Sequence, residues 1–321
     1  MFLGSSSSVP DMDDIPEAVH SAPWAVEGCT HRMTVKVDPI GLTRHDHPIM
    51  VDLPEADVIS DATDPLVSAA EVTPDGTHLG EIPAQIDQSR DGSGWTLTLL
   101  AVGESEPHSP RLFHVYTGNE VTTASPTDAV VAVDDVGEYC GQETWKIETP
   151  AATYMFHQIG GGFASLLDEA GNDWISHRPG EYRGIPNLVH PESGFHPGHD
   201  GAHSEVIADG PIRAHIEVET DDGEWAGRWE IFPHHATLTV TKAGHPYWYL
   251  YEGTPGGELT PEDDFMVRSD GERISAAEEG AEDLPNPEWI YLGSEHADAV
   301  LYHVHHEDDP AIDSYWPRTA K

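Results

Sequence analysis

The segments IRAHIEVET (residues 212–220) and GRWEIFPHHATLTV (residues 227–240) decide the fold class of this chain. In both, β-branched and aromatic residues alternate with polar ones at the period of two that places successive side chains on opposite faces of a strand. His234 and His235 fall in a predicted hairpin turn, where exposure to solvent is the simplest expectation. Similar segments recur with a turn signal roughly every 8–12 residues, which is typical of a sandwich or barrel and not of βαβ units. The sequence therefore predicts an all-β fold.

Turn and linker signals divide the predicted strands into two modules. Short strands such as RMTVKVDP and GWTLTLLAVG, separated by Gly, Asp and Pro turns, predict an N-terminal β module over residues 33–127. A polar N-terminal tail, residues 1–32, precedes it, and the segment VTTASPTD at its end is a predicted linker. Residues 128–321 continue in the same pattern and predict an antiparallel β-sandwich domain. The segment RISAAEEGAEDL, residues 273–284, is a candidate for one or two turns of helix.

The charge of the chain excludes two classes of partner. There are 58 Asp and Glu residues against 15 Lys and Arg, a formal charge of −43 over 321 residues. Such a surface repels nucleic acids and anionic membranes, so we expect neither as a partner. The 9 Trp and 38% hydrophobic residues still supply enough apolar material for a core. The scattered acids and the scarcity of lysine resemble halophilic proteins, whose acidic surfaces stay hydrated in concentrated salt, and most carboxylates are therefore assigned to solubility.

The N-terminus and the cysteines narrow the class further. The first residues contain no basic region, twin arginine or apolar core, so we expect a polar tail on a cytoplasmic protein. No apolar run approaches membrane-spanning length. Cys29 and Cys140 are too few for a disulfide framework or a thiolate zinc site, and we expect both to be small packed side chains without chemistry. The oligomeric state stays open.

The interval from residue 176 to 205 is anomalous, because loops longer than roughly 12–15 residues in compact domains are usually functional or disordered. Its segment YRGIPNLVH places a general acid or base, a permanent cation, an amide and an imidazole close together: Tyr182, Arg183, Asn187 and His190. This set of side chains suits an anionic sugar. The alternative is structural, with Arg183 paired to one of the many acids, Tyr182 packed and His190 capping a turn.

The same loop contains the predicted metal ligands. His196, His199 and His203 could supply three imidazoles to zinc or another transition metal, completed by Asp200 or Glu205. Short metal motifs fix their spacing on a helix or a tight knuckle, whereas this run is rich in glycine, and a chain with 21 histidines produces such clusters by chance. We therefore expect no required cofactor, with a divalent metal as the alternative.

The segment HPYWYLYEG supplies a predicted aromatic platform. Strand alternation would project Tyr247, Tyr249 and Tyr251 to one face and Trp248, Leu250 and Glu252 to the other. One face would then pack in the core and the other would let sugar rings stack, with tyrosine hydroxyls placed to donate protons. The alternative is a tyrosine ladder that only stabilises cross-strand pairs. In LYHVHHEDD, His303 and His305 would likewise share one face of a strand.

Several segments resemble a known group of carbohydrate-active proteins. GLTRHDHPIMVDL, GEIPAQIDQS and GWTLTLLAVG resemble the N-terminal β-barrel-like module of exo-rhamnogalacturonan-lyase-like proteins. GGGFASLLDEAGNDWIS, YRGIPNLVHP and YWYLYEGTPGG are similar to β-supersandwich proteins of the galactose-mutarotase-like type, a superfamily that includes polysaccharide lyases. The resemblance covers residues 34–316 and implies a small β-barrel-like module followed by a supersandwich. It also implies further strands after HHEDDPAIDSYWPRTAK, so we expect an incomplete C-terminus or a short member.

The resemblance implies a lyase that cleaves uronic-acid glycosides by β-elimination. In such a reaction a cation or amide neutralises the C5 carboxylate, a Tyr or His removes the C5 proton and a Tyr or His protonates the leaving oxygen. On this chain Arg183 and Asn187 would neutralise the carboxylate, His190 would be the base, and Tyr182 or Tyr249 the acid. Tyr247, Trp248, Tyr251 and Glu252 would contact the acidic saccharide.

Three alternatives stay open beside the lyase. A mutarotase-type reaction needs a His acid and a carboxylate base, for which the candidates are His190 or His215 with Glu252. A non-catalytic carbohydrate-binding protein would use the face of Tyr247, Tyr249 and Tyr251. A metal-dependent oxygenase or hydrolase would use the histidines.

Overall fold

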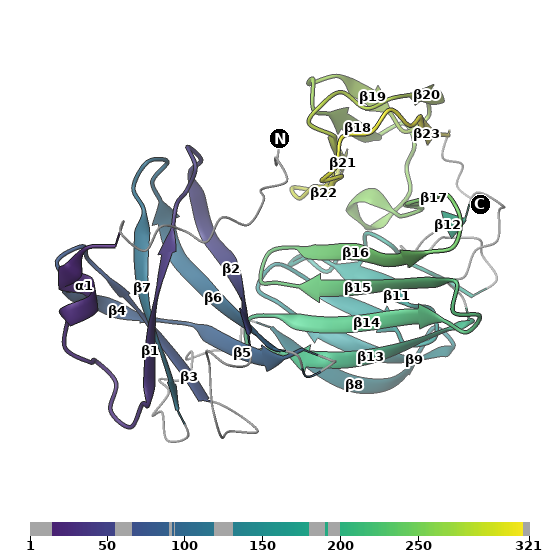
Figure 1. The fold of residues 1–321 in the computed structure, drawn as a ribbon. Coiled ribbons are helices and arrows are strands. Elements are labelled where there is room, and N and C mark those ends of the chain that lie inside the picture. Colours follow the sequence, from purple (N-terminus) through teal and green to yellow (C-terminus); the bar gives the residue numbers. More distant parts are fainter. Residues whose placement is uncertain are drawn as a thin grey trace.

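Figure 1 shows the computed structural model of the chain, which describes residues 15–54, 66–89, 92, 94–118, 131–179, 190–191 and 200–316. These residues form antiparallel sheets, and their helices are α1 (Glu17–Ser21) and the short 3-10 turn η2 (Pro255–Gly257). The all-β prediction is confirmed. None of the helices in this described part has the length and apolarity needed to cross a membrane.

The N-terminal module consists of two sheets packed on a common core. The four-stranded sheet has the order β1 (His31–Val37), β7 (Arg111–Gly118), β3 (Leu66–Val72) and β4 (His78–Ile82). The three-stranded sheet has the order β2 (Arg44–Pro54), β6 (Gly94–Ser105) and β5 (Ala84–Gln88). Fully buried side chains from both sheets, such as Leu97 and Phe113, fill the space between them. The strands thus present an apolar face to this core, and burial of these faces stabilises the module.

Part of the predicted tail belongs to this module. Helix α1 packs on the four-stranded sheet, where Val19 is fully buried against Val72 and Leu112. The guanidinium of Arg32 donates hydrogen bonds to the carbonyl oxygens of His20 and Ala22 and so holds the end of the helix. From residue 15 onward, the predicted polar tail is therefore a packed segment.

The second module is a β-sandwich of two four-stranded antiparallel sheets. One sheet has the order β11 (Gly162–Leu167), β10 (Thr153–His157), β9 (Gln142–Glu148) and β8 (Ala132–Tyr139). The other, which we call the junction sheet, has the order β13 (Ala202–Asp209), β14 (Ala214–Thr220), β15 (Trp225–Ile231) and β16 (Ala236–Ala243). Aromatic side chains from both sheets interlock in the core, where the rings of Phe163 and Trp229 lie 4.6 Å apart. The sandwich architecture predicted for this region is observed.

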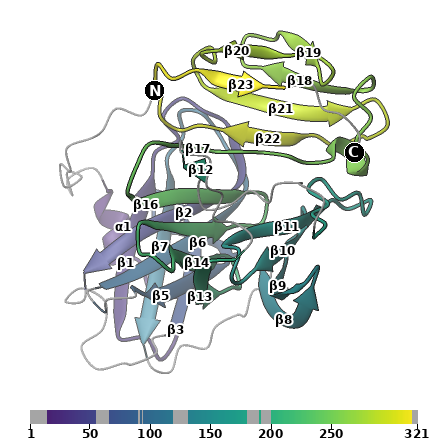
Figure 2. The same ribbon diagram turned by 90° about the vertical axis from the view of Figure 1, so that its right-hand side faces the viewer.

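The C-terminal part adds a third layer of strands beside β16, as both views show (Figures 1 and 2). Its main sheet has the order β19 (Arg273–Ser275), β18 (Asp264–Arg268), β21 (Trp289–Ser294) and β22 (Leu301–Val304). Two small sheets pair β20 (Gly280–Glu282) with β23 (Asp313–Tyr315), and β12 (His190–Pro191) with β17 (Tyr247–Trp248). The helical turns predicted over residues 273–284 were wrong, because Ile274 is buried and its strand pairs with β18. Tertiary pairing here overrides the helix propensity of the Ala and Glu residues.

Candidate functional site at the junction of the modules

The junction sheet has one apolar and one charged face. Ala214, Ile216 and Val218 of β14 point into the sandwich core, where each is almost fully buried. Because side chains alternate along a strand, Arg213, His215 and Glu217 lie on the opposite face. Strand β15 pairs with β14 so that His215 is opposite Glu230 and Glu217 is opposite Arg228. The register therefore gathers two arginines, a histidine and two carboxylates on one face of the sheet.

This charged face meets the N-terminal module, whose strand β5 reaches the junction sheet in Figure 1. A cleft of about 550 Å³ lies between them. The N-terminal module lines it with polar side chains, and the junction sheet lines it with charged ones: Gln88, Ser89 and Thr96 against Arg213, His215, Glu217 and Arg228. A cleft of this size, rich in hydrogen-bonding groups, is suited to a small polar ligand.

Arg213 connects the two modules at the cleft. Its side chain is almost fully buried, and its guanidinium contacts Asp87 of β5 at 2.9 Å and Glu230 of β15 at 2.8 Å. Burial raises the pKa of Asp87, and the positive charge of Arg213 opposes this shift. Since an unpaired buried charge is costly, each of these three groups depends on the others.

His215 is held in its neutral form beside Arg213. The imidazole is 8% exposed, and burial together with the charges of Arg213 and Arg228 lowers its pKa to about 3. Its Nε2 lies 3.7 Å from Glu217 Oε1, too far for a hydrogen bond. At pH values well above 3 the imidazole is therefore in the unprotonated form that a general base requires.

Arg228 is the more accessible of the two arginines. Its side chain is 39% exposed, and its Nε lies 3.3 Å from Glu230 Oε2. Two buried nitrogen atoms next to the cleft, His215 Nε2 and Arg213 Nε, have no hydrogen-bond partner among the described residues. Buried polar atoms are normally paired, so these two mark the cleft as a candidate binding site. In this arrangement the guanidinium of Arg228 can bind an anionic group of a ligand. The neutral imidazole of His215 can take a proton from a carbon atom of that ligand.

Most of the predicted catalytic loop is outside the described residues. Tyr182, Arg183 and Asn187 lie there, so their predicted roles stay predictions. For His190 the structure gives only the backbone, which pairs with Trp248 across β12 and β17. The predicted loop and the predicted aromatic segment are therefore direct neighbours, although they are far apart in the sequence.

The aromatic segment does not form the long alternating strand that we predicted. Strand β17 covers Tyr247 and Trp248 alone, and residues 249–252 are not part of a strand. The Tyr251 hydroxyl donates to the carbonyl oxygen of Trp174, which ties Tyr251 to the sandwich. The rings of Tyr249 and Tyr251 lie 5.7 Å and 4.9 Å from that of His303.

Three side chains of this segment, by contrast, are partly exposed. The ring of Tyr247 lies 6.0 Å from that of Trp225 and roughly perpendicular to it, and both Tyr247 and Tyr249 are 45% exposed. Trp248 is 40% exposed. Glu252 is also exposed, and the carboxylate found beside His215 is that of Glu217. For the mutarotase alternative, in which His190 or His215 would act with Glu252, the carboxylate that the structure places beside His215 is that of Glu217, and the option with His190 stays a prediction.

The predicted metal site is tested only in part. His203 lies on β13, exposed, with its Nδ1 3.8 Å from Asp221, whereas His196 and His199 lie outside the described residues. Within the ranges that the structure describes, no three His, Cys, Asp or Glu side chains are grouped to hold a metal ion. His305, predicted to share a face with His303, pairs with the buried carboxylate of Glu288.

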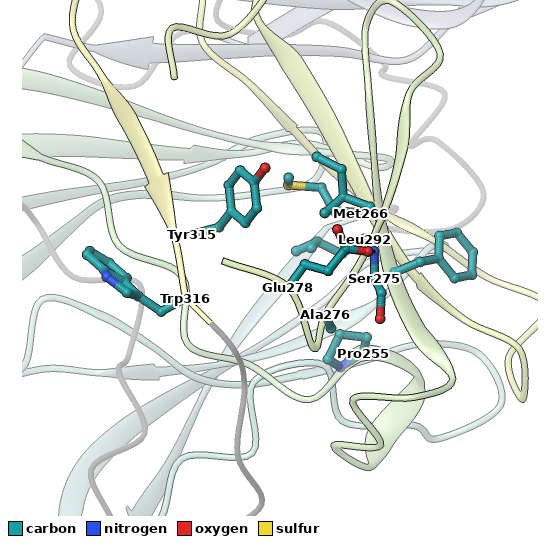
Figure 3. A pocket seen from close by; sticks show the side chains of 10 residues that line it. Pro255, Met266, Ser275, Ala276, Glu278, Leu292, Tyr315 and Trp316 are labelled. Atoms are coloured by element: carbon teal, nitrogen blue, oxygen red, sulfur yellow. The ribbon is translucent and has the colours of Figure 1, made fainter. Parts of the chain in front are cut away.

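A second cavity lies in the C-terminal layer (Figure 3). Met266 and Leu292 line it from the sheet, and Tyr315 and Trp316 line it from the end of the described chain. Its volume is about 40 Å³, which is room for a water molecule and not for a sugar ring. The junction cleft is therefore the better candidate.

Comparisons with known proteins leave the family of this chain open. No protein-family model matches it, and the search of curated proteins finds no match. Its function must therefore be argued from the junction cleft itself.

Sequence reasoning considered His215 but missed Arg213, Glu217 and Arg228. The sequence did contain a signal for them. The alternating polar positions of IRAHIEVET and GRWEI carry both positive and negative charges, whereas a solvent-exposed strand of this acidic chain would carry mainly Asp and Glu. An arginine is rare in a chain with a formal charge of −43, and two on paired strands form a distinctive pattern.

Proposed function

We propose that this protein is a carbohydrate-active enzyme that cleaves uronic-acid glycosides by β-elimination, with the junction cleft as its active site. The observation that carries the proposal is the neutral imidazole of His215 beside two guanidiniums in an open polar cleft. β-Elimination next to a carboxylate needs these two functions: a positive group to stabilise the developing negative charge and a base to take the proton.

In the proposed reaction Arg228 binds the C5 carboxylate of the sugar, because it is the more exposed of the two arginines. His215 removes the C5 proton, the electron pair forms the C4–C5 double bond, and the C4–O bond breaks. The imidazolium of His215 then returns its proton to the leaving oxygen. The bound carboxylate would offset the positive charges that lower the pKa of His215 and would make the imidazole a stronger base in the complex.

Incubation with pectic, glucuronan, ulvan and alginate-type polysaccharides at high salt tests this function. The unsaturated product absorbs in the far ultraviolet, and its formation should rise with ionic strength, because salt screens the repulsion between the acidic protein and a polyanion. Arg228→Met and His215→Gln should each lose roughly 10²–10³ in turnover. His234→Gln, in an exposed turn, is the matched control and should retain activity. No product from any substrate would refute the proposal.

A second candidate function is binding of sugars without cleavage at the aromatic segment. The exposed rings of Tyr247, Trp248 and Tyr249 favour it, since sugar rings stack on such surfaces. Two results would support this function over the lyase. Calorimetry would detect saccharide binding that Trp248→Ala abolishes, and the lyase assay would detect no product.

A further inference from the structure

Gln85 of β5 connects the two modules through hydrogen bonds. It is 4% exposed, and its Oε1 accepts hydrogen bonds from the backbone N–H groups of Ile212 and Arg213 at 2.8 and 2.9 Å. Its Nε2 donates to the carbonyl oxygen of Arg213 at 2.9 Å and to the carboxylate of Asp87. One side chain of the N-terminal module therefore satisfies the backbone of the residues that lead into β14.

These contacts converge on Arg213. Gln85 holds its backbone and Asp87 holds its guanidinium. Two residues of β5 therefore fix the position of Arg213 at its backbone and at the end of its side chain. Glu230 of the junction sheet holds the guanidinium from the other side. Without the N-terminal module, Arg213 would keep one of its two carboxylate partners and lose its backbone anchor.

We propose that Gln85 is a positioning residue of the junction site, through which the N-terminal module fixes Arg213 beside His215. The expected effect on turnover rests on the function proposed above, whereas the effect on His215 itself does not. The charged groups around His215 are Arg213, Glu217, Arg228 and Glu230 on the junction sheet, with Asp87 contacting Arg213 from β5. Of these, Arg213 is the group whose backbone Gln85 holds.

Two substitutions test this role in the full-length chain. Gln85→Met keeps the volume and removes the hydrogen bonds of the side chain to Ile212, Arg213 and Asp87, and Gln85→Asn keeps the amide but shortens its reach. NMR titration of the histidine side chains measures the pKa of His215 directly. We expect this pKa to rise by at least one unit in Gln85→Met and by less in Gln85→Asn, because Arg213 moves and water enters. On a cleaved substrate, kcat/KM should fall at least tenfold in Gln85→Met.

Arg111→Met is the matched control, because Arg111 contacts Glu71, Ser105 and Val102 within the N-terminal module and none of the residues at the junction. It should lower the melting temperature and leave the pKa of His215 unchanged. The inference is overturned if a Gln85 variant loses stability but the pKa of His215 stays at its wild-type value. Gln85 would then only stabilise the fold. If Gln85→Met does not fold, Gln85→Asn decides by the same titration. A wild type without lyase activity would refute the proposed function alone, since the titration needs no substrate.

Discussion

Replacement of Arg213 by methionine tests whether the junction is built around this one buried cation. The substitution keeps an unbranched side chain of similar length and removes the charge. Asp87, whose side chain is 14% exposed, then has no positive partner in the described part of the chain, and Glu230, which is 5% exposed, keeps only Arg228. Both carboxylates would then be ionised in an environment that contains little water to solvate them.

The magnitude follows from this burial. Removing one partner of a buried ion pair typically costs about 3–5 kcal/mol, because the remaining charge is uncompensated. Arg213 serves two buried carboxylates, so we expect a loss in the upper part of that range. Arg273→Met is the matched control: Arg273 and its partner Glu295 are 52% and 57% exposed, and such surface pairs contribute about 0–1 kcal/mol.

The pH dependence gives the prediction a second test. Burial already raises the pKa of Asp87 against the opposing charge of Arg213, and without that charge the pKa would rise further. A carboxyl whose pKa is higher in the folded than in the unfolded state destabilises the fold while it is ionised, and this penalty fades as pH falls. The deficit of Arg213→Met should therefore be largest at neutral pH and shrink in acid.

Urea unfolding at high salt, measured from pH 7.5 down to 4.5, provides the free energies. The reasoning is refuted if Arg213→Met costs no more than Arg273→Met, or if its deficit is the same at every pH. Either result would mean that the two carboxylates are solvated or paired without Arg213.

Two further changes test the site and the core. His215 has a folded-state pKa of about 3 against roughly 6.5 when unfolded, so protonation of the unfolded state lowers the free energy of unfolding of the wild type as pH falls between these values. In His215→Gln this loss, about 1.4 kcal/mol per pH unit in that window, should be absent. Free energies of unfolding that fall with pH in parallel for the two proteins would contradict this. Gly161→Ala should cost roughly 2–4 kcal/mol, because Gly161 has a φ of +68° and a Cβ there would lie 2.6 Å from Val218 Cγ1. Gly171→Ala, at a φ of +85° with open space around it, should cost only about 1–2 kcal/mol, and equal melting temperatures of the two variants would be the contrary result.

The sequence by itself determined the strands of the junction sheet and the faces of their side chains. Alternation in IRAHIEVET is a local property, since the period of two follows from backbone geometry alone. The alternation places Ile216 and His215 on opposite faces of the strand, and in the structure Ile216 is buried in the core whereas His215 lines the cleft. The same rule failed over residues 247–252, where the strand ends at Trp248 and Tyr251 donates a hydrogen bond to the carbonyl oxygen of Trp174, which is 77 positions away in the sequence.

Only the tertiary structure decided that the charged face is part of a cleft. Gln85 and Arg213 are separated by 128 positions, and the local sequence around neither residue predicts that Gln85 binds the backbone of Arg213. The roles of Arg228 and Glu217 likewise depend on which strands pair and on what covers their sheet. A sequence pattern specifies the face on which a side chain lies, because that depends on neighbouring residues. The partners of a buried charge depend on packing between distant segments, and at this junction that packing creates the site.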